Sequence, residues 1–131
     1  MVTFLWRAAG SPEPQSQETS FSDVDASAYY GKAVLWAEEN GITQGADTGR
    51  FYPDRKVSRG QAVTFLSRAQ KAQPTEIQLP FTDVSPDSYY CDSVKWALAE
   101  GITEGTTETT FSPDADCTRA QIVTFLFRAL A

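Results

Sequence analysis

Histidine is missing from this chain of 131 residues, and cysteine occurs only twice. The absence of histidine excludes a Ser-His-Asp triad, a Cys-His pair and any imidazole acid–base step, and it removes most zinc sites. The chain has no basic run and carries a net charge of −6. Because nucleic-acid binding depends on clustered Lys and Arg, we expect no nucleic-acid partner.

Long apolar runs are also missing. No stretch approaches the roughly 18 apolar residues that indicate a membrane span, so we predict no membrane insertion. The first residues are amphipathic and do not form a charged stretch followed by an apolar one. For an exported parent protein, we therefore expect the export signal upstream of this chain.

What the sequence does have is an internal repeat. Shifting the chain on itself by about 60 residues aligns roughly 23 of about 50 positions identically. The closing phrase of the repeat also opens the chain, where Met1 aligns with Ala62 and Ile122. We predict a terminal helix at 1–10, a linker at 11–20, a motif at 21–70, a linker at 71–80 and a second motif at 81–131.

Each full motif is predicted to be a helix, a loop and a second helix. In the first motif, Tyr30, Val34 and Ala37 recur at helical spacing, and Asn40-Gly41 gives a stop. Ser58 is a good N-cap for the second helix, and Thr118 takes its place in the last motif. Neither motif can bury its apolar faces alone, so we expect the motifs to pack on one another.

These features resemble the S-layer homology motif of bacterial cell-surface proteins. The resemblance rests on an F-x-D-V opening, a Trp in the first helix, a G-I-x-x-G turn, an F-x-P-D loop and a [ST]-R-[AG]-Q segment at 58–61 and 118–121. It implies an all-α, pseudo-threefold, three-pronged helical bundle of three motifs, here with an incomplete first motif. Grooves between motifs then hold secondary cell-wall polymer, often a pyruvylated glycan. Such modules lie outside the cell on the wall and are not enzymes.

The resemblance directs attention to Arg59 and Arg119 at the starts of the second helices. A guanidinium there can bind a carboxylate through two parallel hydrogen bonds, and the helix N-terminus adds partial positive charge for the same anion. The structural alternative is a salt bridge to a neighbouring acid. Gln61 and Gln121 stand where the family often has Glu, so they keep hydrogen bonding but lose the charge.

Two further pairs are candidates for sugar contacts. Trp36 and Trp96 can stack on a sugar face, but their spacing within an apolar helix pattern favours the core. Gly45 and Gly105 can let the backbone approach a sugar, although a need for positive φ explains both more simply.

Asp23 and Asp83 can accept hydrogen bonds from sugar hydroxyls, or they form turns and caps. Neither motif shows the calcium-loop pattern or implies a large glycosidase cleft, so we predict no catalysis, no metal and no cofactor. Cys91 and Cys117 both belong to the last motif. They form either a disulfide, in an exported protein, or two separate buried thiols.

The predicted function is non-covalent anchoring of a bacterial surface protein to cell-wall glycan. The alternative is a protein–protein assembly module with no glycan ligand. We expect the missing part of the first motif upstream of Met1. Two other readings are that the isolated helix completes the bundle by itself, or that it pairs with a second chain.

Overall fold

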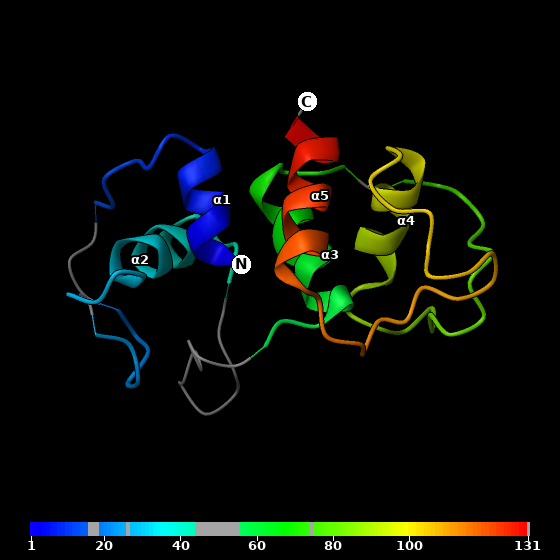
Figure 1. Ribbon diagram of the computed structural model, residues 1–131, viewed down its shortest axis with the longest axis horizontal. Helices are drawn as coiled ribbons and strands as arrows, with labels where there is room; N and C mark the ends of the chain where they lie inside the picture. Colours follow the sequence, from blue (N-terminus) through cyan, green and yellow to red (C-terminus); the bar gives the residue numbers. More distant parts are fainter. Residues whose placement is uncertain (16–18, 26, 44–55, 74, 131) are drawn as a thin grey trace. The chain divides into compact units, whose positions relative to one another are not determined.

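Five helices make up the regular structure of the described residues (Figure 1). The computed structural model describes residues 1–15, 19–25, 27–43, 56–73 and 75–130. The helices are α1 (Val2–Ala8), α2 (Gly31–Glu39), α3 (Arg59–Ala69), α4 (Cys91–Ala99) and α5 (Arg119–Leu130). Within these residues the only β-structure is an isolated antiparallel bridge between Ser58 and Asp116. The all-α prediction is confirmed, and the three-pronged arrangement stays a prediction.

The helices fall into two compact units, Met1–Arg55 and Lys56–Ala131. In the first unit α1 packs on α2, and in the second α3 packs on both α4 and α5 (Figure 1). The motif at 21–70 is therefore divided, because its first helix belongs to one unit and its second helix to the other. Each helix pair joins neighbouring motifs, as expected for motifs that cannot bury their apolar faces alone.

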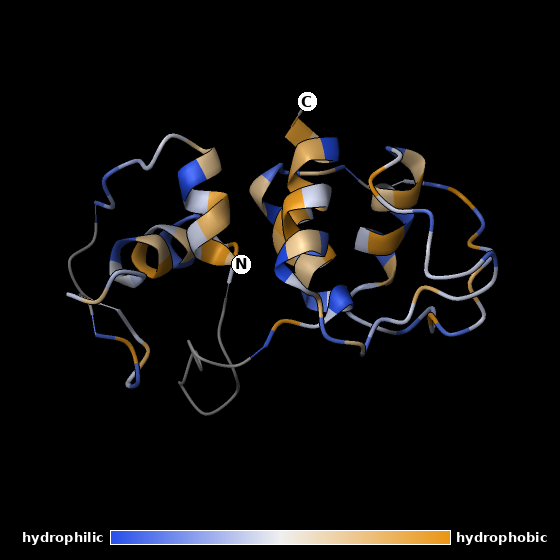
Figure 2. Cartoon of the chain, in the orientation of Figure 1, coloured by the Kyte–Doolittle hydropathy of each residue, from blue (hydrophilic) through white to orange (hydrophobic). Residues whose placement is uncertain are grey.

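The core of the second unit lies between α3 and α4. Val63 and Leu66 of α3 and Val94 of α4 are fully buried, and each such side chain contributes about 1.5–3 kcal/mol through burial. The hydroxyls of Ser67 and Ser93 share a buried hydrogen bond of 2.8 Å between the same two helices. Figure 2 shows that apolar residues gather on the helices of this unit. Both hydroxyls are buried away from water, so each depends on a protein partner. This requirement favours the observed packing of α3 on α4.

The first helix of each full motif ends at a glycine. The N–H of Gly41 donates to Glu38 O at 3.2 Å, and the N–H of Ile42 donates to Ala37 O at 2.8 Å. This pair of bonds closes the helix in a Schellman motif, which needs positive φ at the glycine. The φ angle is +69° at Gly41, after α2, and +73° at Gly101, after α4. The predicted stop after α2 is confirmed.

The end of α3 uses the same closing pattern without a glycine. Lys71 has φ +52°, its N–H donates to Arg68 O at 3.1 Å, and the N–H of Ala72 donates to Ser67 O at 2.9 Å. Gly10 holds the corresponding position after α1 with φ +93°. We expect Lys71→Gly to raise the free energy of unfolding by about 0.5–1 kcal/mol, because it removes the strain of a side chain at positive φ.

Thermal denaturation measured by circular dichroism tests this, with Lys71→Ala as the control. Alanine removes the same charge but keeps a Cβ at positive φ, so it should give no stabilisation. A glycine variant no more stable than the alanine variant would show that the backbone strain at this position is negligible.

The described residues on either side of 16–18 in the segment at 11–20 bond to α2. The Thr19 hydroxyl donates to Glu38 Oε1 at 2.8 Å, and the Gln15 N–H donates to both carboxylate oxygens of Glu39 at 3.1 Å. Burial acts to raise the pKa of Glu38, but the hydrogen bonds from this segment outweigh it, so the pKa lies below the ordinary glutamate value. Gln15 and Thr19 of the predicted linker are therefore tied to the helix that the linker precedes.

Candidate functional site

The start of α3 is covered by the loop at 111–117 of the next motif. The N–H of Arg59 donates to Ala115 O and the N–H of Gly60 donates to Pro113 O, both at 2.9 Å. In the opposite direction, the N–H of Cys117 donates to Val57 O at 2.7 Å. Carbonyl groups of the chain itself therefore satisfy the first N–H groups of the helix, which leaves them unavailable to an anion.

Arg59 lies beneath this loop with only 5% of its surface exposed. Its Nε donates to Phe111 O at 2.8 Å, and its guanidinium carbon lies 4.7 Å from the centroid of the Phe111 ring and 5.5 Å from that of Phe125. Burial lowers the pKa of Arg59, while interactions with Cys117 and then Asp83 oppose the shift. The side chain is thus held by one hydrogen bond and two aromatic rings.

The outer edge of this guanidinium keeps a small part of its surface exposed. Among the described residues, every buried side-chain nitrogen or oxygen has a hydrogen-bond partner. The two terminal nitrogens of Arg59 make no hydrogen bond within that part of the chain, so they reach the solvent. Arg59 is therefore a cation in a fixed orientation with two donors free, an arrangement suited to a carboxylate.

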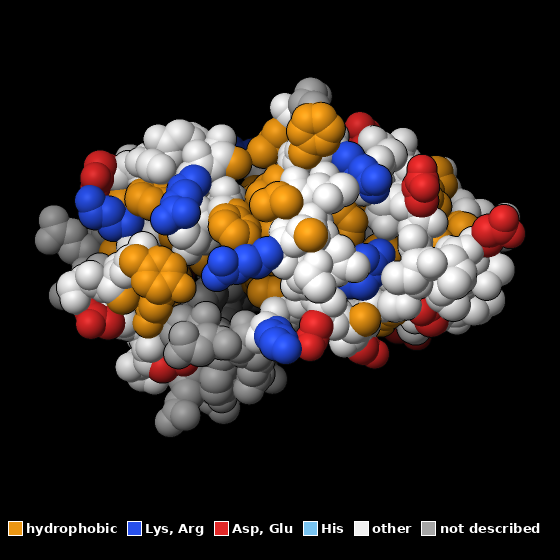
Figure 3. All heavy atoms as spheres, in the orientation of Figure 1, with side chains coloured by type: hydrophobic (Ala, Val, Ile, Leu, Met, Phe, Trp, Pro, Cys, Tyr) orange, Lys and Arg blue, Asp and Glu red, His pale blue; other side chains and the backbone are white. Residues whose placement is uncertain are grey.

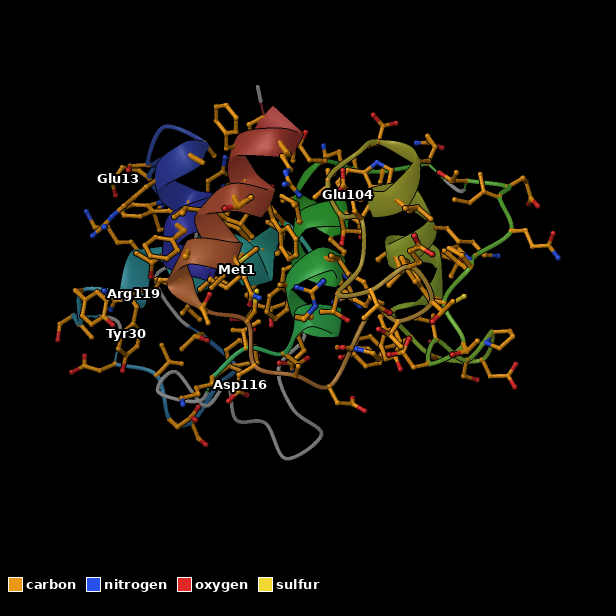
Figure 4. The ribbon with its side chains drawn as sticks, turned by 45° about the vertical axis from the view of Figure 1, so that its right-hand side comes forward. Met1, Glu13, Tyr30, Glu104, Asp116 and Arg119 are labelled. Carbon is orange, nitrogen blue, oxygen red and sulfur yellow. The ribbon has the colours of Figure 1, made fainter. Side chains whose placement is uncertain are left out.

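Arg119 has the same place in α5 but a different environment. It is exposed, and none of the described residues accepts a hydrogen bond from its side chain. Figure 4 labels it at the start of α5, after the loop that carries Asp116. The structure therefore places the two predicted arginines in different environments, since only Arg59 is held in one orientation.

Asp83 holds the loop that covers Arg59. Its two carboxylate oxygens accept from the N–H of Phe111 at 2.9 Å and from the N–H of Ser112 at 2.8 Å. These bonds join residues 28 and 29 positions apart, so they form neither a local turn nor a helix cap, and the sugar contact stays a prediction. Asp23 has the matching place in the first motif, where it is half-buried and has an interaction partner.

Gln61 and Gln121 close capping boxes. The Ser58 hydroxyl accepts from the N–H of Gln61 at 3.1 Å, and Gln61 Oε1 accepts from the N–H of Ser58 at 2.9 Å. Thr118 and Gln121 repeat both bonds at the same distances. The signal for this was in the sequence, because Ser or Thr followed three residues later by Gln or Glu is the capping-box pattern.

The other predicted site residues lie in several places. Trp36 and Trp96 are half-buried on α2 and α4. Gly105 has φ +87°, which fits the simpler explanation for that glycine. Gly45 lies outside the described residues.

Cys91 and Cys117 are buried free thiols in this structure. Burial raises the pKa of the Cys117 thiol, and the nearby charge of Arg59 opposes the shift. The arrangement is the second of the two alternatives that the sequence left open. Both thiols fill space in the core of the last motif.

A tyrosine pair precedes the first helix of each motif. The ring centroids of Tyr29 and Tyr30, and those of Tyr89 and Tyr90, are 5.1 Å apart in an edge-to-face arrangement. The outer rings are largely exposed, at 79% for Tyr29 and 61% for Tyr89. Two exposed aromatics at one repeat position are candidates for stacking on a sugar, and the identical Tyr-Tyr pairs in the aligned repeat could have shown this.

Two negative findings apply to the described residues. They hold no group of three or more Cys, Asp or Glu that could bind a metal ion. Nor is any helix among them both long and apolar enough to cross a membrane.

Comparison with known sequences finds the same two repeated segments. The family model described as the S-layer homology domain matches residues 20–63 and 80–123. The chain belongs to this family.

Relatives of the S-layer homology chain include large surface proteins. It is 32% identical over 117 residues to the surface-layer 125 kDa protein of Lysinibacillus sphaericus, covering 88% of this chain and 10% of that protein. It is 25% identical over 122 residues to the cellulosome-anchoring protein of Acetivibrio thermocellus, covering 88% of this chain and 27% of that protein. An endoglucanase of Bacillus sp. (strain KSM-635) is 31% identical over 115 residues, covering 83% of this chain and 12% of that protein. The chain thus spans a small part of each.

Proposed function

We propose that this chain anchors a bacterial surface protein to the cell wall by binding secondary cell-wall polymer. The observation that carries the proposal is Arg59, a buried cation whose Nε is fixed on Phe111 O while its two terminal nitrogens stay free. The names of the relatives, as surface-layer and cellulosome-anchoring proteins, support a role at the cell surface. The chain itself acts as a binding module and performs no catalysis.

The ligand group at Arg59 is an acid, such as the carboxylate of a pyruvylated sugar. Two parallel N–H···O bonds to the free edge of the guanidinium would bind it in one orientation. Little rotamer entropy would be lost on binding, because the ring of Phe111 and the bond to its carbonyl already hold the side chain. The net charge of −6 repels an anionic polymer at long range, so the affinity must come from such local contacts.

The exposed tyrosines supply the apolar part of the site. A pyranose ring can place its C–H face on the open ring of Tyr89 and leave its hydroxyls in water. The first motif offers the same surface at Tyr29. Affinity at each place would be low, and many chains on one polymer would raise it by avidity.

Calorimetric titration with purified wall polymer tests the proposal. We expect Arg59→Lys, which keeps the charge but loses the planar pair of donors, to weaken binding about tenfold. Tyr89→Ser should weaken it by a similar factor without loss of helix signal. Arg7→Gln, at an exposed arginine of α1, is the control. Equal affinity of all four proteins would exclude this site, and no affinity of the unchanged chain would exclude the function.

A further inference from the structure

The opening of the last motif, residues 81–83, is bound to the loop that follows α4. The N–H and the hydroxyl of Thr82 both donate to Thr109 O, at 2.8 and 3.3 Å. The ring of Phe81 packs 5.8 Å from the ring of Phe111, and both rings are buried. The opening of one motif thus fixes the part of the loop that lies over the arginine of the preceding motif.

Asp83 adds a link that passes through one peptide group. Its carboxylate accepts from the N–H of Ser112 at 2.8 Å. The carbonyl of the same peptide group, Phe111 O, accepts from Arg59 Nε at 2.8 Å. A trans peptide is planar, and its N–H and C=O point in opposite directions. Because the carboxylate holds the N–H on one side, the carbonyl on the other side is aimed at the arginine.

The same link strengthens the bond to the guanidinium. An N–H that donates to a carboxylate polarises its peptide group, so the carbonyl oxygen becomes more negative and accepts a stronger hydrogen bond. Asp83 does this without an ion pair, because the salt bridges within the described part of the chain do not include Arg59. The carboxylate therefore orients the arginine and leaves its two terminal nitrogens to a ligand.

Arg119 shows that the start of a helix does not orient the arginine by itself. Its helix α5 begins with the same capping box as α3, with both bonds at the same distances. None of the described residues accepts a hydrogen bond from the exposed side chain of Arg119. Figure 3 shows apolar side chains at the surface over this helix. What α5 lacks is the cover that the last motif places over Arg59.

We propose that Asp83 is a positioning residue of the polymer site, which orients Arg59 through the carbonyl of Phe111 and makes no contact with the sugar. This inference rests on the proposed binding of an acid group at Arg59. One binding site then needs two motifs, because the arginine belongs to the motif at 21–70 and the carboxylate to the motif at 81–131. An arginine that is oriented before the ligand arrives loses less conformational entropy on binding.

Nuclear magnetic resonance of the chain without polymer tests the orienting role. The Nε–H signal of Arg59, identified by its absence in Arg59→Lys, reports the hydrogen bond to Phe111 O. In Asp83→Asn an amide N–H group replaces one acceptor, so we expect this signal to shift and its exchange with water to become at least about tenfold faster. Asp83→Glu keeps both acceptor oxygens and should give an intermediate result. Asp87→Asn, the same change as the first at another exposed acid of this motif, is the control and should change neither quantity.

Calorimetric titration of the same variants with purified wall polymer tests the consequence for binding. Asp83→Asn should bind about tenfold more weakly than the unchanged chain, and Asp83→Glu should again be intermediate; the latter carries the test if the former does not fold. Weaker binding with an unchanged Arg59 signal would mean that Asp83 contacts the sugar itself. That result, or unchanged affinity after the signal has changed, overturns the proposal. If the unchanged chain does not bind the polymer, the proposed function fails, while the Arg59 signal still shows whether Asp83 orients the arginine.

Discussion

Gly105→Ala is expected to lower the free energy of unfolding by about 3 kcal/mol or more. The φ of +87° at this residue already disfavours any side chain. A Cβ would also lie 2.5 Å from Cε1 of Phe81 and 2.7 Å from the carbonyl oxygens of Thr107 and Thr110. Because two of these atoms belong to the backbone, the whole turn must move, and with it the Phe81 ring that packs 5.8 Å from the ring of Phe111.

Gly101→Ala is the matched control for this prediction. Its φ is +73°, and nothing lies within 4 Å of the added Cβ. Only the backbone strain remains, and we expect a loss of about 1 kcal/mol. In thermal denaturation the midpoint should fall by about 10 °C for Gly105→Ala and by about 4 °C for Gly101→Ala. Equal losses would mean that the close contacts around Gly105 cost nothing.

Arg59→Ala is expected to cost about 2–4 kcal/mol of the free energy of unfolding. The carbonyl of Phe111 would lose its donor under the loop, which costs about 1–3 kcal/mol. The rings of Phe111 and Phe125 would lose the guanidinium between them, worth about 0.5–2 kcal/mol. Truncation also leaves a cavity in the buried part of the site.

Arg119→Ala provides a comparison within the same chain. Both arginines occupy the first position of a helix after the same capping box, so the change in helix propensity is the same. Because Arg119 is exposed, its loss should change stability by less than about 0.5 kcal/mol. Urea denaturation of the two variants measures the two losses in the free energy of unfolding. Similar losses at both positions would show that the contacts of Arg59 with Phe111 and Phe125 are not stabilising.

Local rules predicted the helices and their ends. Ser58 begins α3 as an N-cap, and the stop after α2 falls at Gly41. These features depend on residues within four positions of one another, so they can be predicted from the sequence alone. The same kind of rule would have identified Gln61 and Gln121 as capping residues, but their alignment with a family signature directed the interpretation toward the ligand.

Long-range packing was not predictable in the same way. The bond from Arg59 to Phe111 O joins residues 52 apart, and no periodicity within one motif reveals it. The division of the motif at 21–70 between two packing units is a second example. Both depend on which apolar faces pack together. In repeat proteins these contacts form between neighbouring motifs, so the pattern within one motif does not show them.

Sedimentation of the chain with cell-wall sacculi, before and after removal of the secondary polymer, tests the anchoring function most directly. We predict that the chain sediments with intact sacculi, that removal of the polymer abolishes this, and that added soluble polymer competes. Arg59→Lys, checked for its melting temperature, should bind more weakly. Binding that persists on stripped sacculi, or no binding to intact ones, would contradict anchoring through the secondary polymer.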